Sequence, residues 1–186
     1  MSLQEQQNLL AKLYTDAEFR RAFLSMPEKI GIENELNKIE IKEIAGIMPE
    51  ELDFFADSLF WKRLREVEKF LPLTRKVLGE DFINYFRRFS QNFNPQTVKK
   101  HIEDALGFCR FLQAQEVSEF AKNAAKFEEA KAKFFGLEKR FIICKLDFDI
   151  REISFSTAET RIDNPKNKTK IAIWIRIGNG FRHFFI

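Results

Sequence analysis

Residues 170–186 read Lys170-Ile-Ala-Ile-Trp-Ile-Arg-Ile-Gly-Asn-Gly-Phe-Arg-His-Phe-Phe-Ile186. Every second residue from Ile171 to Ile177 is isoleucine, and such alternation is typical of a strand with one buried face. Gly178-Asn-Gly180 follows, and these residue types tolerate the positive φ of a tight hairpin turn. The stretch therefore predicts a β-hairpin, which an all-helical protein would not contain.

A third strand is predicted upstream, where Leu146, Phe148 and Ile150 alternate with charged residues. The polar residues from Ala158 to Lys168 form a loop, and Ile153 to Thr157 is a candidate fourth strand. A sheet this small is stable only when one face packs on helices, so we expect the isoleucine face to be buried there. It is also too small to close into a barrel, and it should leave an open edge.

Before Gly136 the apolar residues recur at helical spacing. The clearest helix opens at Pro49, with acidic residues in its first turn, and runs to Leu71. Pro72 should interrupt it, and Gly79 should end the next helix, because glycine readily adopts the left-handed conformation. Further helices are predicted over residues 3–13, 80–93 and 117–136. Another helix should start at a capping box at Thr15-Asp-Ala-Glu18, and one more should run from the Asn94-Pro95 step to Leu112 with Val98 facing inward. Residues 31–48 are predicted to be a loop with a brief helical piece.

These patterns predict an α+β protein, in which an N-terminal antiparallel helical bundle precedes a small C-terminal antiparallel sheet ending in a hairpin. Residues 1–136 and 137–186 are either a bundle with a β lobe packed on it or one continuous domain. The charge changes at the same place. The first part has 21 Lys+Arg against 22 Asp+Glu, a net of −1, and the second has 10 against 6, a net of +4.

Composition favours a cytoplasmic protein with an aromatic core. The chain has 22 Phe against 2 Tyr and 2 Trp, and Phe buries a large area without needing a polar partner. Cys109 and Cys144 lie within apolar patterns, as reduced and buried thiols do. Residues 1–16 lack the pattern of a signal peptide, and no apolar run is long enough for a membrane span. The net charge of +3 is small for a general nucleic-acid binder.

No constellation of catalytic or metal-binding residues is visible. The two histidines, His101 and His183, have no second histidine or cysteine at ligand spacing, and Cys109 has no evident base or orienting group. Paired acids such as Glu128-Glu129 fall at helix starts or on polar faces, where the helix dipole and solvent explain them. We therefore expect no metal, no cofactor and no enzymatic activity. A small enzyme whose site is shared across a dimer is an alternative.

Basic residues beside aromatic ones are the best candidates for binding. Trp174 lies on the face opposite the isoleucines, and an exposed Trp among arginines is a frequent binding anchor. The alternatives are a Trp that covers more of the helical bundle or packs under a loop, and a surface that binds single-stranded nucleic acid by stacking and phosphate contacts. The residues that can share this sheet surface are Lys170, Trp174, Arg176, Arg182 and His183. A second basic group lies in the middle helices, at Arg63, Arg65, Arg75, Lys76, Arg87 and Arg88.

One segment carries a family resemblance. Leu71-Pro-Leu-Thr-Arg-Lys-Val-Leu-Gly-Glu-Asp-Phe82 is followed by Asn92-Phe-Asn-Pro95 and by Phe111-Leu112. A proline precedes a Leu-Gly-x-x-Phe helix junction, and an x-Pro step starts the next helix. Over about residues 52–112 the chain resembles the helical domain of partner proteins of multinuclear non-haem iron oxidases, enzymes that modify ribosomally made peptides, as in methanobactin biosynthesis. The tail, Ile173 to His183, is similar to segments of uncharacterised bacterial proteins.

This resemblance implies a partner protein that is not the catalyst. Its helices would dock on the iron oxidase, and its β lobe would take the leader peptide of the precursor as an added strand. The chain departs from that family in being short and in its β tail. We expect a non-catalytic protein- or peptide-binding module with no membrane partner, and with an oligomeric state that the sequence leaves open. The alternative is a nucleic-acid-binding regulatory protein, suggested by the basic C-terminal part.

Overall fold

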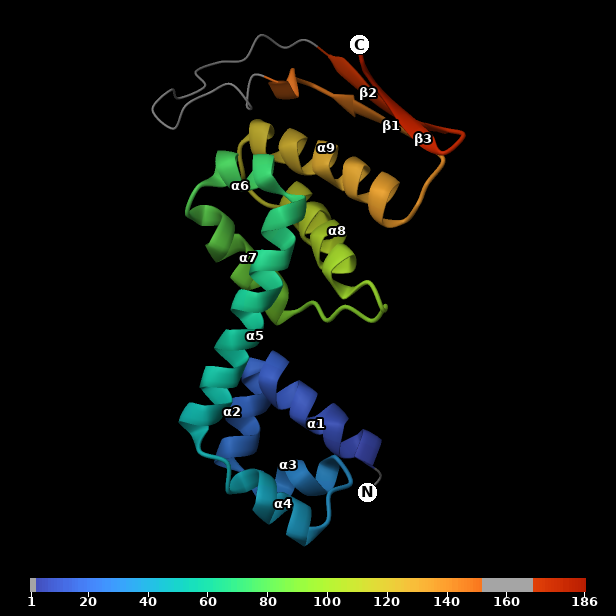
Figure 1. The fold of residues 1–186 in the computed structure, drawn as a ribbon. Coiled ribbons are helices and arrows are strands. Elements are labelled where there is room, and N and C mark those ends of the chain that lie inside the picture. The colour runs from blue at the N-terminus through green and yellow to red at the C-terminus, as the bar shows by residue number, and fades with distance from the viewer. Residues whose placement is uncertain (1–2, 152–168) are drawn as a thin grey trace. The chain divides into compact units, whose positions relative to one another are not determined.

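The computed structural model describes residues 3–151 and 169–186 of the protein. In this part of the chain the helices come first and three antiparallel strands follow, which confirms the predicted α+β class (Figure 1). None of the described helices is long and apolar enough to cross a membrane. The elements are α1 (Leu3–Thr15), α2 (Ala17–Ser25), α3 (Pro27–Glu33), α4 (Lys38–Ala45), α5 (Pro49–Phe70), α6 (Pro72–Leu78), α7 (Asp81–Gln91), α8 (Lys100–Gln113), α9 (Glu119–Gly136), β1 (Phe141–Leu146), β2 (Lys170–Ile177) and β3 (Gly180–Phe185).

The chain forms two compact units. The first unit holds Met1–Arg63 and Ser90–Asn94, and the second holds Leu64–Phe89 and Pro95–Ile186. The division falls inside α5, and α9 shares the second unit with the whole described sheet. Gly136 therefore marks a change from helix to sheet within one unit.

The first unit is closed by helix caps that the sequence only partly predicted. Asp16, and not Thr15, caps α2, because its Oδ1 accepts hydrogen bonds from the next helical N–H groups. Residues 31–48, expected to be mostly loop, contain the end of α3 and all of α4. A capping box starts α4: Asn37 accepts from the Glu40 N–H, and the Glu40 carboxylate accepts from the Asn37 N–H. The buried apolar residues of this unit include Leu9, Leu13, Phe23, Leu36, Ile41 and Ile44.

Both predicted helix breaks in the middle of the chain are confirmed. Pro72 is the first residue of α6, and Leu71 alone separates it from the end of α5 at Phe70. Gly79 ends α6 with a φ of 56°, which glycine adopts without a clash of a Cβ atom. Arg75 ties this turn together, because its guanidinium donates to the Gly79 carbonyl and to the Glu68 carboxylate.

The helix start predicted at Asn94-Pro95 is wrong. Helix α8 begins at Lys100, and Val98, expected to face inward, is 100% exposed. The Glu103 carboxylate accepts hydrogen bonds from the backbone N–H groups of Gln96 and Thr97, at 3.0 and 2.8 Å. A side chain from the first turn of α8 thus holds the preceding residues as a loop, and the Asn-Pro signal does not start the helix.

Helices α7 and α8 confirm the expected aromatic core. The Phe108 ring is fully buried and lies edge-on to Phe82 and Phe86, with centroids 5.1 and 5.2 Å apart. Phe89 and Phe111 extend the same cluster. Edge-to-face pairs of this kind stabilise beyond the area that they bury. Cys109 follows Phe108 on α8 and is fully buried, as predicted.

The C-terminal sheet has the strand order β1-β2-β3, with both pairs antiparallel. The predicted hairpin is confirmed, and Gly178 in its turn has a φ of 56°. The first strand lies upstream of its predicted place: it ends at Leu146, so Phe148 and Ile150 fall beyond it. The candidate strand 153–157 and the polar loop 158–168 lie outside the described residues. Helix α9 lies between the sheet and α8 (Figure 1).

The prediction that the isoleucine face packs on the helices is wrong. Ala172 and Trp174 are buried against α9, together with Cys144 and Leu146 of β1. Strand β2 is apolar on both faces at its centre, so alternation alone does not say which face is buried. The large indole of Trp174 is buried on this face, and the small Ala172 beside it lets α9 approach. This packing decides which face of β2 lies on α9. The isoleucines lie on the face away from α9.

Candidate functional site: the C-terminal sheet

Trp174, the predicted binding anchor, is buried in the second unit. It is 2% exposed, and its ring lies 5.2 Å from Phe127 of α9 and 4.7 Å from His183 of β3. The rings of Trp174 and His183 are nearly parallel, at 14°. Trp174 therefore holds the sheet on α9, and an exposed Trp anchor is excluded.

Arg176 has a similar structural role at the hairpin end of the sheet. Its guanidinium donates to the backbone carbonyls of Phe134 and Lys139, at 3.1 and 3.2 Å. The same group lies 4.9 Å from the centre of the Phe134 ring. These contacts join β2 to the end of α9, so Arg176 is engaged within the chain.

The five predicted residues do not share one surface. Lys170, Trp174, Arg176 and His183 alternate onto the side of the sheet that faces α9, whereas Arg182 lies on the opposite side. Only Trp174 and His183 are in ring contact with each other. Burial and the Lys131 ammonium lower the pKa of His183, which favours the neutral imidazole. The predicted binding surface is therefore not formed as a unit.

One side of the sheet points away from α9, and we name it the outer face. Its apolar residues are Phe141, Ile143, Ile171, Ile173, Ile175, Ile177, Phe184 and Ile186, and its basic residues are Lys145 and Arg182. Six of the apolar side chains are between 37% and 68% exposed. No described helix or strand lies on this face (Figure 1). The isoleucine repeat predicts that these residues share one face, but the structure shows that this face is not the buried one.

Strand β3 forms an edge of the described sheet. Ile171 and Ile186 exchange both backbone hydrogen bonds at 2.9 Å, which fixes the alternation along the pair. The backbone hydrogen bonds to β2 thus come from residues 180, 182, 184 and 186. The backbone N–H and C=O groups of Phe181, His183 and Phe185 point away from β2. We name these outward groups the free edge of β3.

The buried thiols lack the environment of a nucleophile. Burial raises the pKa of Cys109 well above its usual value and that of Cys144 to about 11. Cys144 Sγ lies 3.6 Å from the backbone oxygen of Lys126, a weak hydrogen bond. Both cysteines are buried, as predicted, and thiols of high pKa are poor nucleophiles. Across residues 3–151 and 169–186, no three His, Cys, Asp or Glu side chains gather as metal ligands would.

The prediction that the paired acids lie at helix starts or on polar, solvated faces is wrong for Glu128. It is 2% exposed and lies on α9 facing the start of α6. Its carboxylate accepts hydrogen bonds from the Leu73 and Thr74 N–H groups at 2.7 and 2.9 Å, and from the Thr74 hydroxyl at 2.7 Å. The helical position of Glu128 was readable from the sequence, but the element packed on it was not.

Burial raises the pKa of Glu128 to about 7, although the three hydrogen bonds lower it. The ordinary value near 4.5 applies in the unfolded chain, so the folded state binds the proton more tightly. Stability from this group is complete below pH 4.5 and is lost as the pH rises through 7. We expect the contribution of Glu128 to the free energy of unfolding to fall by about 2.5 kcal/mol between pH 5 and pH 8.

Urea unfolding at several pH values tests this expectation. The lowered pKa of His183 acts in the opposite sense, so the comparison is between wild type and Glu128→Gln, which keeps His183. Relative to Glu128→Gln, the wild type should lose free energy of unfolding as the pH rises from 5 to 8. A difference that is constant from pH 5 to pH 8 would show that the Glu128 proton does not move in this range.

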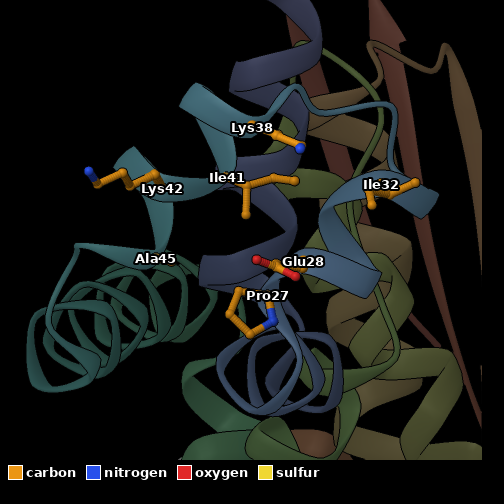
Figure 2. A pocket seen from close by; sticks show the side chains of 7 residues that line it. All are labelled: Pro27, Glu28, Ile32, Lys38, Ile41, Lys42 and Ala45. Carbon is orange, nitrogen blue, oxygen red and sulfur yellow. The ribbon is translucent and has the colours of Figure 1, made fainter.

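A pocket of about 430 Å³ lies in the first unit between α3 and α4. In Figure 2 Glu28 lies below Ile41, and the Lys42 side chain extends away from the other labelled residues. None of the buried polar side chains of the described residues lines this pocket, so it lacks a fixed polar group to orient a ligand. Its lining residues are Pro27, Glu28, Ile32, Lys38, Ile41, Lys42 and Ala45 (Figure 2).

The basic residues of the middle helices are largely engaged within the chain. Arg63 donates to the Phe93 carbonyl, and Arg88 donates to the Gln115 side chain. Arg75 pairs with Glu68 and Glu80. These contacts neutralise part of the positive charge of the middle helices, and they use other basic side chains as donors to groups of the same chain.

Comparisons of the chain with known protein families, with curated proteins and with solved structures found no match. The outer face and the free edge of β3 are exposed features of the second unit that the described elements leave uncovered.

Proposed function

We propose that the protein is a non-catalytic module that binds a peptide segment of another protein by strand addition. The free edge of β3 is the observation that carries this proposal. An extended peptide can pair with the outward N–H and C=O groups of Phe181, His183 and Phe185, and affinity then comes from main-chain hydrogen bonds. The strand contains no proline or inward-pointing lysine, the devices that commonly block such an edge.

Side chains on both faces of β3 supply the selectivity of such a site. Phe181 is 50% exposed, and its ring lies 5.0 Å from Phe135 of α9. On the outer face, Arg182 and Phe184 flank the added strand with one charge and one exposed ring. Alternate residues of a bound peptide would meet these two surfaces in turn. A peptide with apolar residues on both faces and an acidic residue near Arg182 fits this chemistry.

The resemblance over about residues 52–112 extends this proposal to a particular partner. It implies that the bound strand is the leader of a precursor peptide and that the helices dock on an iron-dependent oxidase. This finer statement rests on the resemblance alone. Purification of the tagged protein at physiological salt, with and without nuclease, tests it, and recovery of an iron-oxidase-like protein in both samples is the expected result.

Replacing His183 with proline is the sharpest test of strand addition. The His183 N–H points away from β2, so proline removes an outward donor and spares the bonds to β2. Peptides selected on wild type from a displayed random library should bind His183→Pro at least about tenfold more weakly. His183→Val is the matched control, since it also loses the ring stacked on Trp174 but keeps the N–H.

Equal binding by the proline and valine variants would contradict strand addition at β3. Failure of the library to yield any binding peptide would do the same. Circular dichroism of both variants should match that of wild type, because residue 183 lies on an edge strand.

Nucleic-acid binding is a second candidate because residues 137–186 carry a net charge of +4. Arg140 and Lys139 are exposed next to β1, although Arg176 is held by backbone carbonyls. Binding to a single-stranded oligonucleotide that weakens steeply with added salt would favour this function. Binding that is absent at low salt would exclude it.

A further inference from the structure

The outer face is an apolar surface that runs across all three described strands. Its three central rows across the strands are Phe141-Ile175-Arg182, Ile143-Ile173-Phe184 and Lys145-Ile171-Ile186, and Ile177 adds to the hairpin end. Its exposed fractions rise to 60% at Ile177 and 68% at Ile186. The side chains therefore form an apolar layer that the described chain leaves open.

The exposed area is sufficient for a protein interface. With about half of six large side chains exposed, the apolar area is on the order of 500 Å². This lies near the upper end of the roughly 300–600 Å² that the largest patch on a monomer reaches. Two such faces packed together would bury about 1,000 Å², the lower bound for a specific interface.

We propose that a second copy of this chain covers the outer face, so that two sheets pack face to face in a two-fold symmetric dimer. The positions of the two charges support this occupant. Lys145 and Arg182 lie on opposite edge strands and in the first and last of the three rows, at diagonally opposite corners. The centre of these rows holds no lysine or arginine. A cation there would face the same cation of the second copy when the two chains associate.

A two-fold axis along β2 makes the face complementary to itself. The rotation exchanges the two edge strands, so Arg182 of one copy meets Phe141 of the other, and Lys145 meets Ile186. An arginine over an aromatic ring is favourable, whereas two facing cations are not. Ile173 at the centre meets its own equivalent, and aligned sheets pack in this way with interdigitating side chains.

This inference goes beyond strand addition and does not depend on it. Face-to-face packing leaves the backbone groups of the β3 free edge open, although it uses the outer-face side chains of Arg182 and Phe184 that also flank an added strand. The test uses the protein alone, without any peptide, so a failure of one proposal does not carry over to the other.

Sedimentation velocity of the full chain over a wide concentration range tests the dimer. Wild type should show a concentration-dependent species of twice the chain mass. Ile143→Lys and Ile177→Lys each place a charge on the face, at positions 56% and 60% exposed where lysine costs the fold little. Each should weaken dimerisation at least about tenfold. Ile39→Lys, at a position 70% exposed in the first unit, is the matched control and should dimerise as wild type does.

Three results would overturn the proposal. The first is a wild-type protein that is monomeric throughout the range. The second is a dimer that both lysine variants leave unchanged while their circular dichroism matches wild type. The third is a monomer that binds vesicles of anionic phospholipid and loses this binding in Ile143→Lys, which would assign the face to a membrane surface. Should one lysine variant fail to fold, the other decides the outcome.

Discussion

Replacing Trp174 with alanine should lower the free energy of unfolding of the second unit by about 3–5 kcal/mol. The indole is 2% exposed and lies between Phe127 of α9 and His183 of β3. Its removal leaves a cavity beneath β2 that Ala172 and Cys144 are too small to fill. The sheet and α9 should therefore separate at lower denaturant concentration.

Trp61→Ala is the control, since Trp61 is 40% exposed in the first unit and its loss should cost less than about 1 kcal/mol. Urea unfolding followed by circular dichroism measures both variants. Since each variant keeps one of the 2 tryptophans, fluorescence reports on one unit at a time. A Trp174→Ala protein with unchanged stability and weakened partner binding would instead restore Trp174 as an exposed anchor.

Glu128→Ala should lower the free energy of unfolding by about 3 kcal/mol. The substitution leaves the Leu73 and Thr74 N–H groups and the Thr74 hydroxyl without their acceptor. Thr74 is fully buried, so water does not replace that acceptor without rearrangement. Helix α6 should lose its attachment to α9, and the amide protons of its first turn should exchange faster.

Glu119→Ala is the matched control on the same helix. The Glu119 side chain is 65% exposed and pairs with Lys122, one turn further along α9, at 3.0 Å. Surface pairs of this kind contribute less than about 1 kcal/mol. Equal losses of stability in the Glu128 and Glu119 variants would show that the buried hydrogen bonds add nothing to α6.

The expected result for Trp174 bears on function through the inner face of the sheet, which packs on α9. If the inner face is needed for folding, a partner cannot bind there without unfolding the second unit. A partner that binds the sheet then has the outer face and the free edge of β3 open to it. The test at His183 addresses the edge, and the tests at Ile143 and Ile177 address the outer face.

The sequence by itself determined those features that depend on a few neighbouring residues. Pro72 and Gly79 break the helices where expected, because a missing N–H and a positive φ act locally. The hairpin at Gly178 and the start of α5 at Pro49 follow from the same kind of signal. Strand and helix periods, which span one element each, gave the α+β class.

Only the tertiary structure decided how these elements meet. Alternation in β2 fixes which residues share a face, but burial of Trp174 against Phe127 selects the face that packs on α9. Glu128 is buried because α6, more than fifty residues earlier in the chain, places its N–H groups there. Asn94-Pro95 does not start α8 because Glu103 holds the preceding loop. Such contacts join residues from different elements, and no pattern within a single element contains them.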